Sequence, residues 1–208
     1  MSVEEKLIVV HEEDGEPTGE VVFRSELIKD KKWGRSTNVF VLNPEGKILC
    51  HQRSFKKERY PGIWMTHFGG HVTEGESFKV NALKEMEEEL GIKVPAVQMI
   101  PWRTSRKDAQ RLWMRDFLTI FSGDISTLEF QKSEIEQIKW FSAEEILEAL
   151  DADDLPEDEK KDWKAGIYHF FSDYQCMRAV LTAALDMGIV GTDYHPLHKW
   201  QLEKKAKV

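Results

Sequence analysis

The strongest structural prediction in the chain is a helix over residues 77–90, because this stretch contains neither glycine nor proline. Ser77 is suited to accept a hydrogen bond from the first turn, and Gly91 stands where helices commonly end in a left-handed residue. Bulky apolar residues recur along the stretch at Val80, Leu83, Met86 and Leu90. The helix therefore offers apolar positions for packing and leaves a separate face for polar residues.

Three glutamates of this helix share one face, because Glu85, Glu88 and Glu89 stand three and four positions apart. Carboxylates crowded in this way repel one another unless a cation neutralises them, and Mg²⁺ and Mn²⁺ prefer such oxygen ligands. An isolated acidic run is more often simply solvated. Here, however, the glycine pair ending at Gly70 permits a close backbone approach, and Glu76 stands where a carboxylate braces a loop or favours a helix start. The sequence therefore predicts a divalent-metal site.

The chain before and after this helix alternates strand-like segments with turn residues. Turn sequences such as Asp14-Gly15-Glu16-Pro17 and Asn43-Pro44-Glu45-Gly46 separate short apolar runs, which is the pattern of hairpins. Strands are expected at residues 7–11, 20–23, 38–42, 48–52, 97–102, 112–121 and 135–141, and a short helix at 142–150. This mixture predicts the α+β class.

The composition changes after residue 156, where an acidic, lysine-rich stretch gives way to aromatic and Ala-Leu-Met residues through residue 187. We expect two helices there, packed on the preceding core. The chain is therefore divided into a domain over residues 1–155 and a helical C-terminal extension over residues 156–208. The extension is expected either to cap the pocket or to form the contact of a homodimer.

Composition argues against several classes of protein. A chain of 208 residues with 41% hydrophobic residues can bury a sizeable core, and a formal net charge of −8 argues against a nucleic-acid partner. Cys50 and Cys176 stand far apart and outside any CxxC pattern, so neither a disulfide framework nor a cysteine zinc site is expected. The sequence shows no basic-apolar leader and no run approaching about 18 apolar residues. We therefore expect a cytoplasmic protein without a membrane partner.

The residues from Gly70 to Ile92 resemble the signature of the Nudix family, which is written GX5EX7REUXEEXGU with U a bulky aliphatic residue. Gly70 is followed after five residues by Glu76, and after seven more by Lys84-Glu85-Met86-Glu87-Glu88-Glu89-Leu90-Gly91-Ile92. One position departs from the signature, because Lys84 replaces an arginine that in the family orients the catalytic glutamates. Lysine keeps the charge but loses the planar, two-pronged donor geometry of a guanidinium.

This resemblance implies a Nudix-type α/β/α sandwich of mixed sheet, in which the motif forms a loop, a helix and a second loop. It implies Mg²⁺ or Mn²⁺ as cofactor, with Glu88 and Glu89 as metal ligands and Glu85 as a ligand or base. Gly70 belongs to the same metal site, and Lys84 to the catalytic group. The cation would offset charge on a diphosphate, lower the pKa of a coordinated water and align it for attack on phosphorus.

Residues outside the motif are candidates for the general base and for substrate binding. Either Glu134 or Glu136 is expected to act as the general base, and Glu136 is one of the predicted catalytic residues. The candidates for substrate binding are Arg53, Lys57, Trp64 and His71. The two cations suit a substrate phosphate, although loop cations are often only solvated, and the tryptophan suits either base stacking or core packing.

A longer resemblance, over roughly residues 7–150, is to the isopentenyl-diphosphate isomerase branch of the superfamily. It is carried by Pro17-Thr18-Gly19, residues 38–42, Gln52-Arg53, Lys57, Pro61-Gly62-Ile63-Trp64 and His71. Gly69 replaces the isomerase cysteine, and two of its metal histidines fall at Leu27 and Gly34. His71 matches the remaining histidine, and Asp116 falls near an acidic ligand. Protonating a double bond requires a positioned acid and base, so these losses favour hydrolysis.

The sequence therefore predicts a Nudix-type pyrophosphohydrolase that cleaves a phosphoanhydride in a nucleoside-diphosphate-linked or related small diphosphate. An enzyme similar to isopentenyl-diphosphate isomerase is one alternative. A non-catalytic nucleotide-binding regulator is the other, and Lys84 is the feature that favours it.

Overall fold

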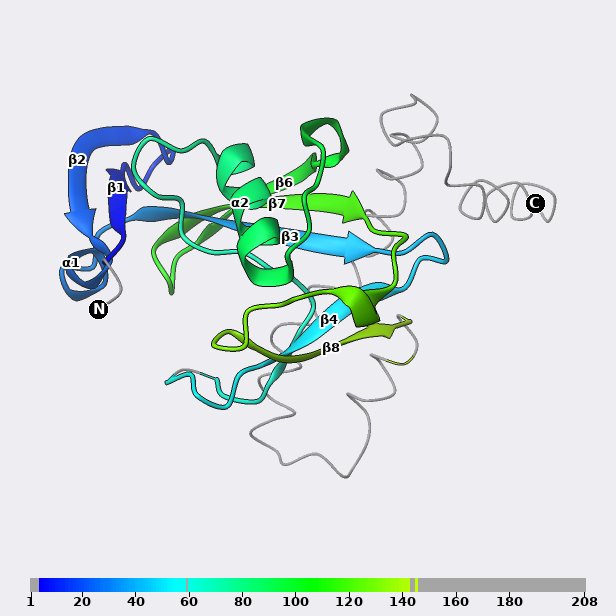
Figure 1. The fold of residues 1–208 in the computed structure, drawn as a ribbon. Coiled ribbons are helices and arrows are strands. Elements are labelled where there is room, and N and C mark those ends of the chain that lie inside the picture. Colours follow the sequence, from blue (N-terminus) through cyan, green and yellow to red (C-terminus); the bar gives the residue numbers. More distant parts are fainter. Residues whose placement is uncertain (1–3, 59, 143–144, 146–208) are drawn as a thin grey trace.

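The computed structural model describes residues 4–58, 60–142 and 145 of the chain. The elements are β1 (Lys6–Val10), β2 (Pro17–Phe23), α1 (Arg24–Lys29), β3 (Gly34–Leu42), β4 (Ile48–Arg53), β5 (Trp64–Met65), α2 (Phe78–Leu90), the 3-10 helix η1 (Ala96–Gln98), β6 (Ile100–Lys107), β7 (Leu112–Ile120), the 3-10 helix η2 (Ile125–Thr127) and β8 (Ile135–Phe141). A six-stranded mixed sheet lies at the centre, in the order β5-β4-β3-β7-β6 with β8 also paired to β4, and helix α2 crosses one face (Figure 1). The predicted α+β class is confirmed.

Strand β3 is the central strand, and its sequence reflects burial on both faces. Residues 39–42 are four consecutive buried hydrophobic side chains, as expected for a strand with a parallel neighbour. That neighbour is β7, which pairs with β3 in an unbroken parallel register from Gly34↔Leu112 to Leu42↔Ile120. The long register gives the sheet a rigid centre on which the helix rests.

The chain after β5 leaves β4 and runs along β3. The strands β3 and β4 are paired only near their shared turn, while Phe68 and His71 form isolated bridges with β3. The carbonyl oxygen of Gly70 accepts hydrogen bonds from the backbone N–H of Thr37 (2.9 Å) and from the hydroxyl of Ser36 (2.9 Å). This pairing fixes the glycine pair against β3, directly before the loop that leads into α2.

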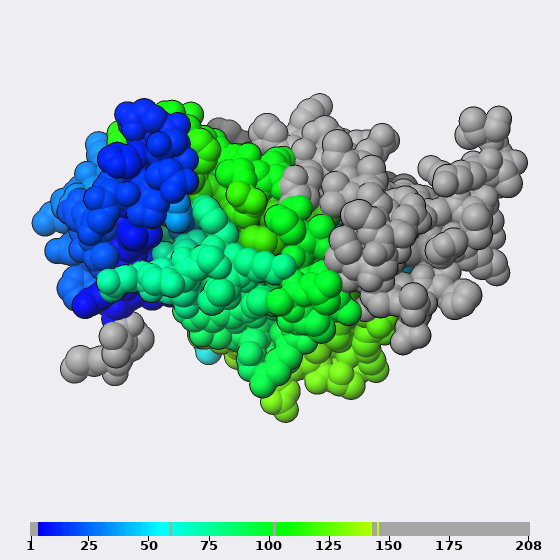
Figure 2. All heavy atoms as spheres, turned by 90° about the horizontal axis from the view of Figure 1, so that it is seen from above, coloured from blue at the N-terminus to red at the C-terminus, as the bar shows by residue number. Residues whose placement is uncertain are grey.

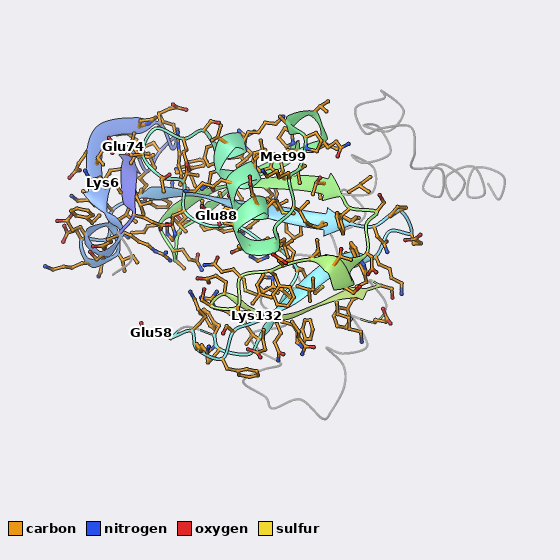
Figure 3. All side chains as sticks on the ribbon, in the orientation of Figure 1. Lys6, Glu58, Glu74, Glu88, Met99 and Lys132 are labelled. Atoms are coloured by element: carbon orange, nitrogen blue, oxygen red, sulfur yellow. The ribbon has the colours of Figure 1, made fainter. Side chains whose placement is uncertain are left out.

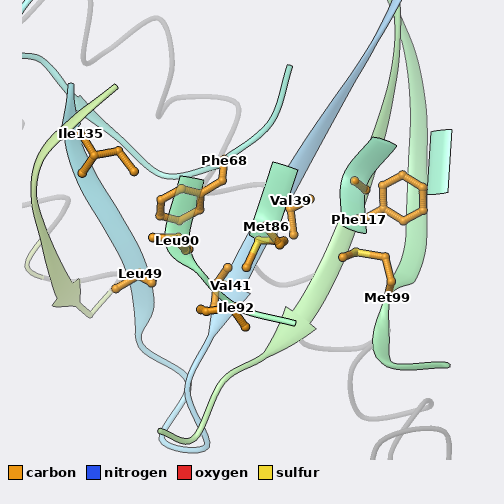
Figure 4. Close-up of a cluster of buried hydrophobic side chains, with 11 residues drawn as sticks. Val39, Val41, Leu49, Phe68, Met86, Leu90, Ile92, Met99, Phe117 and Ile135 are labelled. Carbon is orange, nitrogen blue, oxygen red and sulfur yellow. The ribbon is translucent and has the colours of Figure 1, made fainter. Parts of the chain in front are cut away.

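Helix α2 is held mainly by packing. Its residues Ala82, Met86 and Leu90 have no exposed surface, and they meet one cluster of buried side chains from the sheet and its loops (Figure 4), namely Val39, Val41, Leu49, Phe68, Ile92, Met99, Phe117 and Ile135. Each large apolar side chain buried in this way contributes about 1.5–3 kcal/mol. An isolated helix of 13 residues is marginal in water, so this cluster fixes where the helical glutamates lie.

The hairpin of β1 and β2 with helix α1 forms a separate unit at one end of the molecule, shown in blue in Figure 2. Its own small core consists of Leu7, Val9, Val22 and Leu27. The backbone N–H of Glu74 donates to the carbonyl oxygen of Lys6 (2.9 Å), and Leu7 forms a bridge with Thr73. Figure 3 labels Lys6 and Glu74 at this contact. The hairpin therefore braces the loop that precedes α2.

Several elements differ from the sequence-based prediction, among them the short strand β5 and the 3-10 helix η2, which were not predicted. Helix α1 was not predicted, because Phe23 is no capping residue, yet the Glu26 carboxylate accepts from the Phe23 N–H (2.9 Å). The strand predicted at residues 97–102 was partly wrong, because the Gln98 N–H closes a 3-10 turn onto the Pro95 carbonyl (2.8 Å). The strand begins only at Ile100 and continues to residue 107.

The predictions for the C-terminal part of the chain concern residues at the end of the described region or beyond it. At the start of the predicted helix 142–150, the Glu145 N–H donates to the Ser142 hydroxyl (3.1 Å) and the Ser142 N–H donates to the Glu145 carboxylate (2.6 Å). The rest of that helix, the boundary at residue 155 and the extension 156–208 lie outside the described residues. None of the described helices is long and apolar enough to cross a membrane.

Candidate active site

Helix α2 begins and ends as predicted. The Ser77 hydroxyl accepts from the Val80 N–H (3.2 Å), and Gly91 is left-handed with φ 69°. Because both ends are fixed, the glutamates between them occupy defined turns. Glu88 is exposed on α2 (Figure 3), whereas Glu85 and Glu89 are partly buried near the glycine pair of residues 69–70.

Glu89 is tied to the first glycine of the pair. Its Oε2 accepts a hydrogen bond from the backbone N–H of Gly69 at 3.2 Å. Gly69 has φ 139°, and a Cβ there would collide with the carbonyl oxygen of Thr37, so the conformation requires glycine. Burial and the neighbouring charge of Glu85 raise the pKa of Glu89 to about 8. Such a carboxyl group favours neutralisation by a proton or a cation.

Glu85 lies against the second glycine. A Cβ on Gly70 would stand 2.5 Å from Glu85 Oε1, so the absence of a side chain makes room for the carboxylate. Burial, together with the charges of Glu88 and Glu5, raises the pKa of Glu85 to about 7. Because Glu5 precedes β1, the N-terminal hairpin unit adds negative charge to the same region.

Lys84, the departure from the family signature, forms an ion pair with Glu76. Its Nζ lies 3.4 Å from Glu76 Oε1. Burial acts to raise the pKa of Glu76, but a hydrogen bond from Thr73 and the charge of Lys84 outweigh it, so the pKa lies below the usual value. The loop carboxylate is therefore ionised and anchored to the helix.

The donor set fits a hard divalent cation. Glu85 and Glu89 bring carboxylate oxygens to adjacent glycines, and Glu88 adds a third carboxylate on the neighbouring exposed face. Within the described part of the chain, no three His, Cys, Asp or Glu side chains are already grouped closely enough to hold a metal ion. Burial first, and the like charges of neighbouring glutamates second, raise the pKa of Glu85 and Glu89, so both groups are poorly solvated as anions and a cation would stabilise their ionised form.

A second charged group adjoins Glu89. Lys57 Nζ lies 2.6 Å from Glu134 Oε1, and an Arg53 guanidinium nitrogen lies 3.9 Å from Glu134 Oε2. The backbone N–H of Gln131 donates to the carbonyl oxygen of Glu89 (3.0 Å), and the Glu134 N–H donates to the Gln131 carbonyl oxygen (2.9 Å), so this group adjoins the end of α2. Of the two candidates for the base, Glu134 lies here, whereas Glu136 is exposed on β8.

The two remaining substrate-binding candidates have different surroundings. Trp64 packs edge-on against Phe141 with ring centroids 5.2 Å apart, a contact typical of sheet packing. His71 follows the glycine pair, and burial together with the charge of Arg24 lowers its pKa to about 4. Its carbonyl oxygen accepts from the side-chain amide of Asn81 (3.0 Å). His71 therefore contacts the site region through its backbone, and Trp64 supports the sheet.

The isomerase-like positions are occupied differently. Leu27 is buried in the hairpin core. Asp116 is fully buried, and its Oδ2 accepts two hydrogen bonds from Arg103 (2.8 and 2.7 Å) while its Oδ1 accepts one from Asn38 (3.0 Å). Asn38 alternates with Thr37 and Val39, so this cluster lies on the sheet face opposite α2. Arg103 is therefore the ionic partner of Asp116.

Two contributors to the site were not predicted. Glu5 is distant in sequence, and only the docking of the hairpin brings its charge near Glu85. Asn81 carries a recognisable signal, because asparagine is unfavourable inside a helix and stands four residues before Glu85. An asparagine at that helical spacing favours a contact with the glutamate, whereas its burial is seen only in the structure.

In this α+β domain, a glycine-containing loop leads into a glutamate-bearing helix that packs on a mixed sheet. The family model for the NUDIX domain matches residues 32–163. The chain belongs to the Nudix family, and the prediction of a Nudix-type pyrophosphohydrolase is confirmed at the level of the family.

Relatives of known sequence and structure agree with this assignment. An uncharacterized Nudix hydrolase of Pseudomonas aeruginosa, PA4841, is 30% identical over 143 residues, covering 69% of this chain and 82% of the relative. The isopentenyl-diphosphate Delta-isomerase of Citrobacter koseri is 22% identical over 148 residues, covering 70% and 82%. The crystal structure of DR0079 from Deinococcus radiodurans matches with a TM-score of 0.61 at 21% identity, covering 78% of this chain and 99% of that one. This last likeness confirms the fold.

Proposed function

We propose that the chain hydrolyses a phosphoanhydride bond in a small diphosphate, with a nucleoside diphosphate linked to another group as the favoured substrate class and Mg²⁺ or Mn²⁺ as cofactor. The observation that carries this proposal is the placement of two partly buried carboxyl groups, Glu85 and Glu89, at the glycine pair with their pKa values raised to about 7 and 8. Groups in this state favour a cation and through it an anionic phosphate.

Glu85, Glu88 and Glu89 would hold the cation. When bound, the cation supplies charge neutralisation for the diphosphate and acidifies a water molecule for attack on phosphorus. Glu89 is held toward the site by the Gly69 N–H, and Glu85 has room at Gly70. Both side chains are thus positioned by the loop before substrate arrives, which lowers the entropic cost of assembling the site.

Glu134 is the favoured general base, in preference to Glu136. It lies near Glu89, and its pairing with Lys57 at 2.6 Å keeps the carboxylate oriented. As base it would accept the proton of the attacking water at a carboxylate oxygen. Arg53 and Lys57 surround the same carboxylate and would bind the oxygens of a substrate phosphate that enters beside it.

Hydrolysis is favoured over isomerisation by the geometry at two positions. A side chain at Gly69 would collide with the Thr37 carbonyl, so this backbone conformation excludes a cysteine there. Asp116, the acidic residue that resembles an isomerase position, is neutralised by Arg103 on the opposite face of the sheet. The described residues therefore lack the isomerase cysteine at position 69, and the carboxylate of Asp116 is paired with Arg103.

The proposal is tested by incubating the full chain with Mg²⁺ or Mn²⁺ and a panel of nucleoside triphosphates, ADP-ribose, NADH, dinucleoside polyphosphates, nucleotide sugars and prenyl diphosphates. Metal-dependent release of nucleotide or phosphate is the expected result. Conversion of a prenyl diphosphate without phosphate release would instead establish an isomerase. Thermal stabilisation by a nucleotide with no turnover on any compound would establish a binding role.

A further inference from the structure

The amide of Asn81 forms the centre of a hydrogen-bond network beneath the glutamates. Asn81 and Thr37 are both fully buried, and the Thr37 hydroxyl donates to Asn81 Oδ1 at 2.5 Å. Asn81 Nδ2 lies 3.0 Å from the His71 carbonyl oxygen, 3.4 Å from Glu76 Oε2 and 3.4 Å from Glu85 Oε1. One side chain thus connects β3, the loop and the catalytic helix.

The orientation of this amide follows from its partners. A hydroxyl can donate to Oδ1, whereas the three groups around Nδ2 are all oxygen acceptors. The reverse orientation would place an oxygen against three oxygens. The NH₂ group has two protons, so one serves the His71 carbonyl and the other is shared between the Glu76 and Glu85 carboxylates.

This shared proton lies beside Lys84, where the replacement of the signature arginine by lysine leaves fewer N–H donors for the two carboxylates. An arginine at position 84 has five N–H donors in a planar fork, but Lys84 has a single ammonium group. That ammonium pairs with Glu76 Oε1, while Asn81 reaches the other oxygen, Oε2, and also Glu85. Together the two side chains hold both oxygens of Glu76 and one of Glu85.

We propose that Asn81 is a positioning residue of the hydrolytic site, which supplies the second donor that the signature arginine would otherwise provide and so orients Glu76 and Glu85. Asn81 contacts neither substrate nor metal; it acts through the two glutamates. This inference rests on the proposed function, because hydrolytic activity is one of its readouts. The affinity for Mn²⁺ is a second readout, which requires no turnover.

The test compares Asn81→Ala, Lys84→Arg and the double variant with the unchanged full chain. Each protein is measured for kcat and KM, for Mn²⁺ affinity by water-proton relaxation, and for thermal unfolding. Asn81→Ala is expected to lower both kcat and Mn²⁺ affinity by roughly 10–100-fold, the usual effect of losing a group that orients metal ligands. Adding Lys84→Arg is expected to restore most of both losses, because the guanidinium supplies the missing donors.

A matched control separates positioning from packing. Asn43→Ala removes another buried asparagine, whose side-chain Oδ1 accepts a hydrogen bond from the Lys47 N–H in the turn between β3 and β4 (2.7 Å). It is expected to lower thermal stability while leaving Mn²⁺ affinity unchanged. If Asn81→Ala does not fold, Asn81→Ser replaces it, since a hydroxyl retains a partner for Thr37.

The outcomes are distinguishable. Equal losses in Asn81→Ala and in the double variant would show that Asn81 only supports packing, and unchanged Mn²⁺ affinity in folded Asn81→Ala would overturn the proposal in the same way. If the unchanged chain hydrolyses nothing in the panel, the proposed function fails, but the rescue of Mn²⁺ binding by Lys84→Arg still decides the role of Asn81.

Discussion

Gly69 donates its backbone N–H to the carboxylate of Glu89 across 3.2 Å, so a glycine in a conformation closed to other residues holds a glutamate of helix α2. Glu85 stands in a comparable relation to Gly70, where a Cβ would lie 2.5 Å from its Oε1. The two contacts differ in what a side chain would strike. At Gly69 it would meet the backbone of β3, and at Gly70 the end of a flexible side chain.

The two glycines are therefore expected to respond differently to alanine. Gly69→Ala should lower the free energy of unfolding by about 1–3 kcal/mol or more. The alanine would be strained at the positive φ of this position, and its Cβ would also collide with the Thr37 carbonyl oxygen. Gly70→Ala should leave stability nearly unchanged but displace the Glu85 carboxylate, with a loss of activity of roughly 10-fold or more. Urea unfolding and initial rates measure both, and a stable, active Gly69→Ala variant would contradict this geometry.

Stability without metal should depend on pH in a defined direction. The folded-state pKa values of Glu85 and Glu89, about 7 and 8, exceed the unfolded value of 4.5. The folded state therefore binds more protons between these values, so the contribution of both groups to stability falls as pH rises from about 4.5 to 8. Mg²⁺ competes with those protons, and its stabilising effect should grow over the same window.

The measurement is the Tm of the metal-free and Mg²⁺-bound protein from pH 5.5 to 9, with Glu89→Gln as the control. In the unchanged chain, the slope of Tm against pH should differ between the metal-free and the Mg²⁺-bound protein. Because glutamine does not titrate, Glu89→Gln should show a much smaller difference between these two slopes. A Mg²⁺ effect on Tm that is the same at every pH, or identical pH profiles for the variant and the unchanged chain, would contradict the assignment of the two carboxyls to the metal site.

Glu134 and Glu136 offer a matched pair for locating the general base. Glu134→Gln should reduce kcat by roughly 10²–10⁴-fold, the range for loss of a positioned base, with a smaller effect on KM. Glu136→Gln removes the same charge from an exposed position on β8 and should change kcat less than about twofold. The reverse result in steady-state kinetics would move the role of base to Glu136.

The sequence predicted the helix and its glutamates well, because a helix cap, a C-terminal glycine and a fixed spacing are local features. Ser77 and Gly91 cap α2 as expected, and the strands around the turns are present. The orientation of Lys84 and the burial of Asn81 were beyond local pattern, since both depend on the loop pairing with β3. Likewise, Glu5 reaches the site only through the docking of the hairpin.

The difference between Glu134 and Glu136 shows the same limit. Both precede or begin the same predicted strand, and their sequence contexts are alike. What separates them is the contact of Glu134 with Lys57, 77 positions away in sequence. Contacts of that separation are set by sheet topology, which a single sequence does not specify residue by residue.

A Mg²⁺ titration of turnover for Glu89→Gln beside Glu87→Gln tests whether Glu89 holds the cation of a metal-assisted hydrolase. Glu87 is a neighbouring glutamate on the same helix, exposed and paired with Lys93 at 3.2 Å, so it controls for the loss of one negative charge. If Glu89 holds the cation of a metal-assisted hydrolase, we expect turnover to fall by roughly 10²-fold or more in Glu89→Gln and to stay near normal in Glu87→Gln. Equal turnover and equal Mg²⁺ dependence in the two variants would contradict it.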